Sequence, residues 1–144
     1  MIDLLDRRAV GLQTYQPNDP PLGSNLYWES PEFTRILVHS IFFTLVTDAN
    51  VANRRVTLQA SHGSVPFSQA PAPGHQVASK TIYYRFAPCI LGIDQSTDLS
   101  YQWAPISEHL YLDNQHSLQT NIINIQATDQ ISAVAIRFYQ SLPR

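Results

Sequence analysis

The sequence predicts an all-β protein, an antiparallel β-sandwich of jelly-roll type preceded by an extended N-terminal arm. Of the 144 residues, 44% are hydrophobic and 10% aromatic, but only 14% are charged. An average soluble domain has about 25% charged residues. Here amide and hydroxyl side chains fill the difference, and such residues favour strands and loops over helices. Runs of β-branched and aromatic residues also recur between turn-forming residues, which is typical of a sandwich.

The chain is long enough for one domain, in which we expect residues 1–22 to be the arm and residues 23–144 the sandwich. Three prolines within residues 17–21 exclude both helix and strand interior there. The arm cannot bury its own apolar side chains, so it must lie on its own domain or on a neighbouring molecule. The residues expected to make this contact are Leu4, Leu5, Val10, Leu12 and Tyr15.

The strand pattern begins with residues 34–47, which are β-branched and aromatic throughout. Both alternating faces of this segment are largely apolar, which predicts a central strand covered on two sides. A turn at residues 48–50 separates it from residues 53–60, which alternate between apolar and polar side chains. The second segment therefore predicts a half-buried antiparallel partner.

Residues 61–76 contain three prolines and two glycines, and we expect a long loop that could contact a partner. Strand patterns resume at residues 77–86 and, briefly, at 99–103. Three more follow at residues 109–112, 117–126 and 130–139, with turn-forming residues between them.

Charge argues against binding to nucleic acid, and the lengths of the apolar runs argue against a membrane span. The net charge is −2, and the nine basic residues are scattered along the chain, whereas nucleic-acid binding needs a clustered basic surface. No run approaches the roughly 20 apolar residues of a membrane span. Acidic residues interrupt the first apolar positions, so we expect no signal peptide. The single cysteine, Cys89, has apolar neighbours and is expected to be buried and inert.

Motifs for catalysis or metal binding do not occur at the expected spacings, so we expect a protein that is not an enzyme and that has no cofactor and no metal. The five histidines form no ligand pair, and His39 fits an ordinary strand position. Residues 94–98 match no calcium loop, and no serine stands in a nucleophile elbow. The aromatic residues Trp28, Tyr84 and Trp103 belong either to the core or a subunit interface, or to a sugar-stacking surface.

One structural cluster is expected from the arginine pair. Arg54 and Arg55 begin a strand, and Asp48 and Asp129 lie in turns. Guanidinium groups hold carboxylates in fixed geometry, so these residues could join two ends of the sandwich.

Four segments together resemble a known group of proteins. They are residues 28–31 (WESP), 45–58 (LVTDANVANRRVTL), 78–84 (ASKTIYY) and 121–134 (NIINIQATDQISAV). This combination looks like small β-sandwich proteins encoded among the structural genes of tailed bacteriophages, similar to capsid decoration (cement) proteins. That group usually has a glycine where this chain has Thr128.

The resemblance implies a virion structural protein that binds the major capsid protein and stabilises the shell. It also implies a homotrimer on the capsid surface, assembled in the host cytoplasm. Two alternatives remain open at this stage. One is a glycan-binding module of a phage fibre or tail, using residues 61–76 and exposed tyrosines or tryptophans. The other is a small hydrolase that brings two acids or a Ser-His pair together.

Overall fold

A computed structural model describes residues 9–31, 34–95 and 100–141, and within these ranges it contains strands and no helix. The strands are β1 (Ala9–Tyr15), β2 (Tyr27–Glu29), β3 (Arg35–Val46), β4 (Arg55–His62), β5 (Val65–Pro71), β6 (Thr81–Ala87), β7 (Ile93–Gln95), β8 (Tyr101–Pro105), β9 (Tyr111–Leu112), β10 (His116–Ile123) and β11 (Gln130–Ser141). The described part of the chain accordingly has no helix suited to crossing a bilayer.

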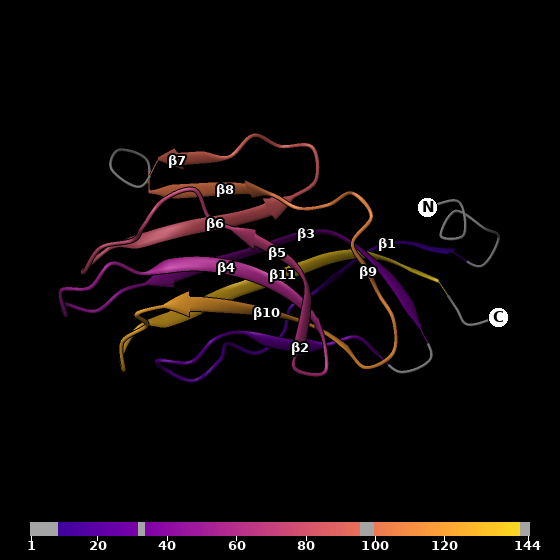
Figure 1. The fold of residues 1–144 in the computed structure, drawn as a ribbon, viewed down its shortest axis with the longest axis horizontal. Coiled ribbons are helices and arrows are strands. Elements are labelled where there is room, and N and C mark those ends of the chain that lie inside the picture. Colours follow the sequence, from indigo (N-terminus) through magenta and orange to yellow (C-terminus); the bar gives the residue numbers. More distant parts are fainter. Residues whose placement is uncertain (1–8, 32–33, 96–99, 142–144) are drawn as a thin grey trace.

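The strands form two packed sheets, which confirms the predicted β-sandwich (Figure 1). The larger sheet has the order β1-β11-β3-β6-β8-β7, with the short β9 also paired to β3. The smaller sheet has the order β2-β10-β4-β5. Neighbouring strands are antiparallel, except that β6 and β8 run parallel. The chain passes repeatedly from one sheet to the other, so residues distant in sequence meet in one core.

The middle of the predicted arm is an edge strand. Residues 9–15 form β1, which pairs antiparallel with β11, and Leu12 lies opposite Tyr139. This stretch therefore lies along its own domain, which is one of the two arrangements that the sequence left open. Of the five expected contact residues, Leu4 and Leu5 fall outside the described residues.

The prediction of a long loop at residues 61–76 is wrong. The structure has a β-hairpin there, with β4 continuing to His62 and β5 beginning at Val65. Gly63 occupies the tight turn with a φ of 58°, a left-handed conformation that glycine adopts without steric cost. The prolines Pro66 and Pro71 are tolerated because β5 is the edge strand of the smaller sheet.

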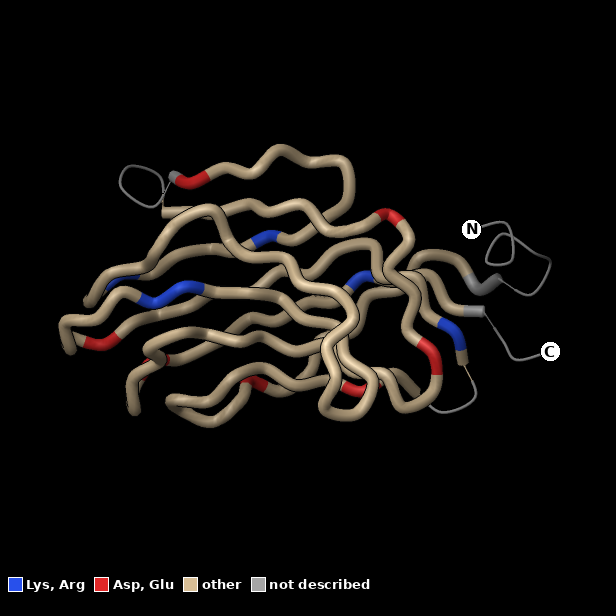
Figure 2. The backbone as a smooth tube through the Cα atoms, viewed as in Figure 1, with Lys and Arg blue, Asp and Glu red and all other residues tan. Residues whose placement is uncertain are grey.

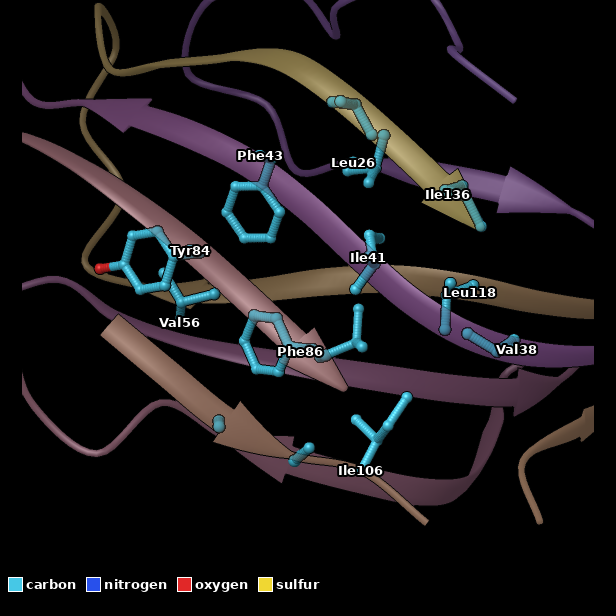
Figure 3. Close-up of a cluster of buried hydrophobic side chains, with 14 of the residues drawn as sticks. Leu26, Val38, Ile41, Phe43, Val56, Tyr84, Phe86, Ile106, Leu118 and Ile136 are labelled. Carbon is cyan, nitrogen blue, oxygen red and sulfur yellow. The ribbon is translucent and has the colours of Figure 1, made fainter. Parts of the chain in front are cut away.

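The core lies between the two sheets and is built from their inward-facing residues. Phe43 on β3 stacks on Tyr84 of β6 with ring centroids 5.2 Å apart, and Phe86 lies 6.1 Å from Phe43 (Figure 3). Val56 of β4 and Leu118 of β10 contribute to the core from the smaller sheet. Burial of these apolar side chains is the main stabilising contribution to the fold.

Candidate functional site

The expected arginine–carboxylate cluster centres on Arg54, whose side chain is fully buried. Its Nε donates to Asp129 Oδ2 at 2.9 Å, and Nη2 donates to Asp129 Oδ1 at 3.0 Å and to Asp48 Oδ1 at 2.7 Å. Its Nη1 donates to the carbonyl oxygens of Asn50 and Ala52 at 2.9 and 2.7 Å. All the N–H groups of the guanidinium are thereby satisfied, as burial of a charge requires.

The two carboxylates also receive hydrogen bonds from the turns around them. Asp129 is fully buried and accepts from the backbone N–H groups of Asp48 and Gln126. Burial acts to raise the pKa of Asp48, but hydrogen bonds from Thr128 and Asn50 outweigh it and lower that pKa below its usual value. The cluster fixes the turn after β3, the start of β4 and the turn before β11 to one another.

Thr128 belongs to the Arg54 cluster, whereas Arg55 does not. Thr128, which stands where the resembling proteins usually have glycine, donates its hydroxyl to Asp48 Oδ2 at 2.7 Å. Arg55 makes none of the cluster's described hydrogen bonds: it follows Arg54 in the extended strand and lies opposite Ile123 of β10. Three of the four predicted residues are therefore brought together, and their role is structural.

A second buried polar network lies beside the first. Gln76 pairs its backbone with that of Arg54, and its side-chain amide donates to the carbonyls of Leu45 and Lys80. The hydroxyl of Tyr84 donates to Gln76 Oε1 at 3.0 Å. Burial, aided by the charge of Asp94, raises the pKa of Tyr84, so the phenol stays protonated as the donor. These bonds anchor the segment 72–80 across the end of the sandwich.

The outer side of the larger sheet is unusually rich in aromatic residues. Strand register and alternation place one set of side chains on this side. We call this set the aromatic face: Leu12, Leu37, His39, Phe42, Tyr83, Arg85, Tyr101, Trp103, Tyr111, Arg137 and Tyr139. The two described sheets account for all described strands, so no described strand covers this face. Most of its side chains are half-buried among one another, and Tyr83 is 59% exposed.

Arg85 lies at the centre of the aromatic face. Its guanidinium carbon is 5.3 Å from the ring centroid of Phe42 on one side and 5.3 Å from that of Trp103 on the other. A guanidinium over an aromatic ring is held by a cation–π attraction, and both arginine and aromatic residues are enriched in protein interfaces. Arg85 Nε is buried and has no hydrogen-bond partner within the described ranges. The face therefore combines a positive centre with an apolar surround.

His39, expected as an ordinary strand histidine, belongs to the aromatic face. Its ring meets that of Tyr139 edge-on at 6.1 Å, and its Nδ1 is 3.1 Å from Ser40 Oγ. Burial, followed by the positive charges of Arg137 and Arg85, lowers the pKa of His39 below its usual value. The imidazole is therefore neutral near pH 7, and it adds no charge to the face.

Two of the expected arm residues have described side chains, Leu12 and Tyr15, and they lie against different parts of the domain. Leu12 projects on the aromatic face beside Tyr139. Tyr15 is 46% exposed, with its ring centroid 6.1 Å from that of Trp28. Trp28 in turn packs against the core through Phe138. Val10 lies opposite Gln140 in the pairing of β1 with β11.

A polar pocket of about 320 Å³ lies beside β2 and the β4–β5 turn, both of which belong to the smaller sheet. It is lined by Tyr27, Glu29, Ser30, His62, Gly63, Asn114 and Gln115. The Tyr27 hydroxyl donates to Glu29 Oε1 at 2.7 Å. Hydroxyl, carboxylate, amide and imidazole groups therefore meet in one shallow site, which sequence reasoning did not identify because they come from three distant segments.

The prediction of a buried Cys89 is wrong. Cys89 is exposed in the turn after β6, where its φ of 59° places it in the left-handed region. Its apolar neighbours in sequence do not cover it, because the turn directs the side chain away from the core. Among the described residues, no group of three or more His, Cys, Asp or Glu side chains converges in a way that could hold a metal ion.

Among the described residues the charged side chains are few, and apart from the adjacent Arg54 and Arg55 they are spread along the chain (Figure 2). The chain matches no known family model, no curated protein and no solved structure.

The aromatic face was missed as a site, although the sequence contained a signal for it. The apolar outer positions of β3 predict a strand covered on both sides, but the structure covers only the inner side. Leu37 and Phe42 are thus apolar residues over which the described strands place no second layer. Among the described residues the outer side of β3 is not covered as predicted, and the difference marks this face as the main candidate site.

Proposed function

We propose that this protein is a non-enzymatic virion structural protein, a capsid decoration protein that binds the major capsid protein and stabilises the shell. It acts as a homotrimer on the capsid surface and is assembled in the host cytoplasm. The observation that carries this proposal is the aromatic face, a broad surface around Arg85 whose composition suits protein contacts. Such a surface suits a protein that acts as an assembly of several copies, as a symmetric shell requires.

The strand order supports a finer description of the fold. Without the insertion β7–β9, the sheets become β1-β11-β3-β6 and β2-β10-β4-β5. In an eight-stranded jelly roll the same interleaving arises from folding one long antiparallel hairpin over on itself. We therefore propose that the sandwich is a jelly roll with a three-strand insertion between β6 and β10.

The shell contact is assigned to the arm because its apolar residues need a surface outside the arm on which to lie. Within the described residues, the arm contributes β1 as the edge strand of the larger sheet. Leu4 and Leu5 would then add buried apolar area against capsid subunits, at about 25 cal/mol per Å². Repetition by symmetry would make many such small contacts strong.

Reconstitution with empty shells tests this proposal. Shells assembled from the major capsid protein encoded with this chain are incubated with the protein, sedimented, and heated to find the temperature of disassembly. We expect the protein to co-sediment and to raise that temperature. A Leu4→Asp, Leu5→Asp variant should bind more weakly, whereas Val51→Asp, at a 98% exposed turn position, should bind normally. If the wild-type protein stays in the supernatant, the proposal is wrong.

A second candidate function rests on the polar pocket. Its mixture of hydroxyl, carboxylate, amide and imidazole groups beside the exposed Tyr27 suits a sugar ring, which would fit a glycan-binding module of a fibre or tail. Titration of host polysaccharides against tryptophan fluorescence, with Trp28 in the same strand as Tyr27, tests it. No change in fluorescence across a broad glycan set would weigh against this function.

A further inference from the structure

We infer that the aromatic face is a contact surface between copies of this chain, and that it packs against the acidic edge of the next copy in a closed ring. The acidic edge is the segment 16–31, which includes β2. The inference rests on the proposed function for the number of copies, which is three. The choice of surfaces comes from the structure itself.

The outer side of β3 carries apolar residues that no described strand covers. A strand with apolar residues on both faces is typical of a sheet with layers on both sides. In the isolated chain the second layer is absent from the described residues, and Leu37 and Phe42 are left on the outer side. A second copy would supply that layer.

The area of the aromatic face can be compared with the area that stable interfaces bury. The aromatic face spans five neighbouring strands, in the order β1, β11, β3, β6 and β8. Strands lie about 4.8 Å apart, and about seven residues along each strand rise by about 3.3 Å per residue, so the face measures roughly 20 Å by 23 Å. This is on the order of 450 Å² in projection, before the relief of the side chains is counted, and stable interfaces bury about 800 Å² of accessible surface on each partner. The projected area of the aromatic face is a little over half of that, so this face can supply a large part of a stable interface, and the relief of its side chains and the surrounding residues must supply the rest.

The charge of the aromatic face is positive, which limits the surfaces that can pack against it. The central rows of the aromatic face carry Arg85 and Arg137 and, among the described residues placed there by strand register, no carboxylate. Two copies stacked face to face would set these arginines against their own counterparts, and like charges across an interface are costly. A symmetric dimer through this face is therefore disfavoured, and a heterologous contact with a different surface is favoured.

The acidic edge has the complementary character. Residues 16–31 include Asp19 and Glu29 and contain no lysine or arginine. The same segment exposes two large apolar side chains, Leu22 and Tyr27, each 56% exposed. It therefore offers carboxylates to the arginines and apolar area to the aromatic rings. Because a face and an edge point in different directions on one protomer, repetition of this contact turns through an angle and can close a ring.

Native mass, measured by light scattering at several concentrations, tests the inference with three variants. Tyr83→Glu places a charge on the aromatic face. Ile123→Glu is its matched control, because Ile123 is a 53% exposed strand residue on the other sheet. A double Asp19→Lys, Glu29→Lys variant reverses the charge of the edge. Thermal unfolding by circular dichroism checks that each variant is folded.

We expect the wild type and Ile123→Glu to have about three times the chain mass of 16.2 kDa. Tyr83→Glu and the edge variant should both fall to one chain mass. Hydroxyl-radical footprinting of the wild type should find Tyr83 protected and Ile123 accessible, a result that does not depend on any variant folding.

The inference would be overturned if the wild-type protein were monomeric at every concentration measured, from a 100-fold dilution to the highest soluble concentration. It would also be overturned by a trimer that is unaffected by Tyr83→Glu or by the edge variant. The shell co-sedimentation described above separates the two proposals. A monomer that binds shells removes this inference alone, and a trimer that ignores shells removes the proposed function alone.

Discussion

Arg54 and Asp129 form a fully buried ion pair in which two guanidinium nitrogens meet the two carboxylate oxygens, Nε to Oδ2 at 2.9 Å and Nη2 to Oδ1 at 3.0 Å. The residues are 75 positions apart in sequence. Their pairing ties the start of β4 to the turn before β11, and it holds one end of the sandwich together. A bidentate arrangement fixes the relative orientation of both segments as well as their distance.

Replacing Arg54 should be strongly destabilising. In Arg54→Met, Asp129 would keep a buried charge without its partner, which typically costs about 3–5 kcal/mol of unfolding free energy. Urea unfolding followed by circular dichroism measures this. Arg55→Met is the matched control, since Arg55 is the next residue and lies outside the described hydrogen bonds of the cluster. Equal losses for the two variants would contradict the structural role given to Arg54.

Stability should fall in acid through Asp48. Its pKa is lower in the folded protein than the usual value of 3.8. The unfolded chain therefore takes up the proton first, so the stabilisation is complete above 3.8 and is lost as the pH falls through the folded-state pKa. Thr128→Val removes one hydrogen bond to Asp48 and should make the acid dependence of the unfolding free energy shallower. An unchanged pH profile in Thr128→Val would show that this hydroxyl does not set the pKa.

The imidazole of His39 should titrate below its usual pKa of 6.5. Burial disfavours the charged ring, and the positive charges of Arg137 and Arg85 add to that effect. Because the folded-state pKa is depressed, the His39 contribution to stability is present above 6.5 and is lost as the pH falls toward the folded value. In Arg137→Gln the His39 pKa should move up toward 6.5, as followed by the NMR shifts of its ring protons. A downward shift would contradict the placement of these residues on one face.

Gly23 should tolerate substitution less well than Gly63. Both have positive φ angles, 70° and 58°, so alanine is strained at either position by about 1–2 kcal/mol. A Cβ on Gly23 would also lie 2.9 Å from the carbonyl oxygen of Ala127, whereas a Cβ on Gly63 would meet nothing within 4 Å. The melting temperature of Gly23→Ala should therefore be lower than that of Gly63→Ala. The reverse order would mean that the loop before β2 does not approach the turn at Ala127 as described.

Local sequence patterns predicted the strands well where alternation was clean. Residues 53–60 and 130–139 correspond closely to β4 and β11, because one buried face imposes a period of two. The hairpin at β4–β5 was mistaken for a loop because Pro66 and Pro71 normally interrupt strands. Their position on an edge strand, which makes them tolerable, depends on the strand order and is not visible in the sequence.

One of the two main sites could be predicted from the sequence, and the other could not be predicted as a whole. The pairing of Arg54 with Asp48 and Asp129 could be anticipated, since buried arginine needs carboxylates and turns supply them. The apolar outer positions of β3 are a signal for one strand of the aromatic face, but the whole face could not be anticipated, because it requires the register of β1, β11, β3, β6 and β8. The stacking of Arg85 between Phe42 and Trp103 joins residues from three strands, and only the sheet order brings them together.

The most direct test of the account is electron cryo-microscopy of shells decorated with this protein, at a resolution that separates strands. The account predicts three copies around each occupied position, with the aromatic face of each copy covered by the acidic edge of the next and the arm reaching the capsid subunits. Shells without added density, or single copies with Tyr83 and Trp103 facing solvent, would contradict it.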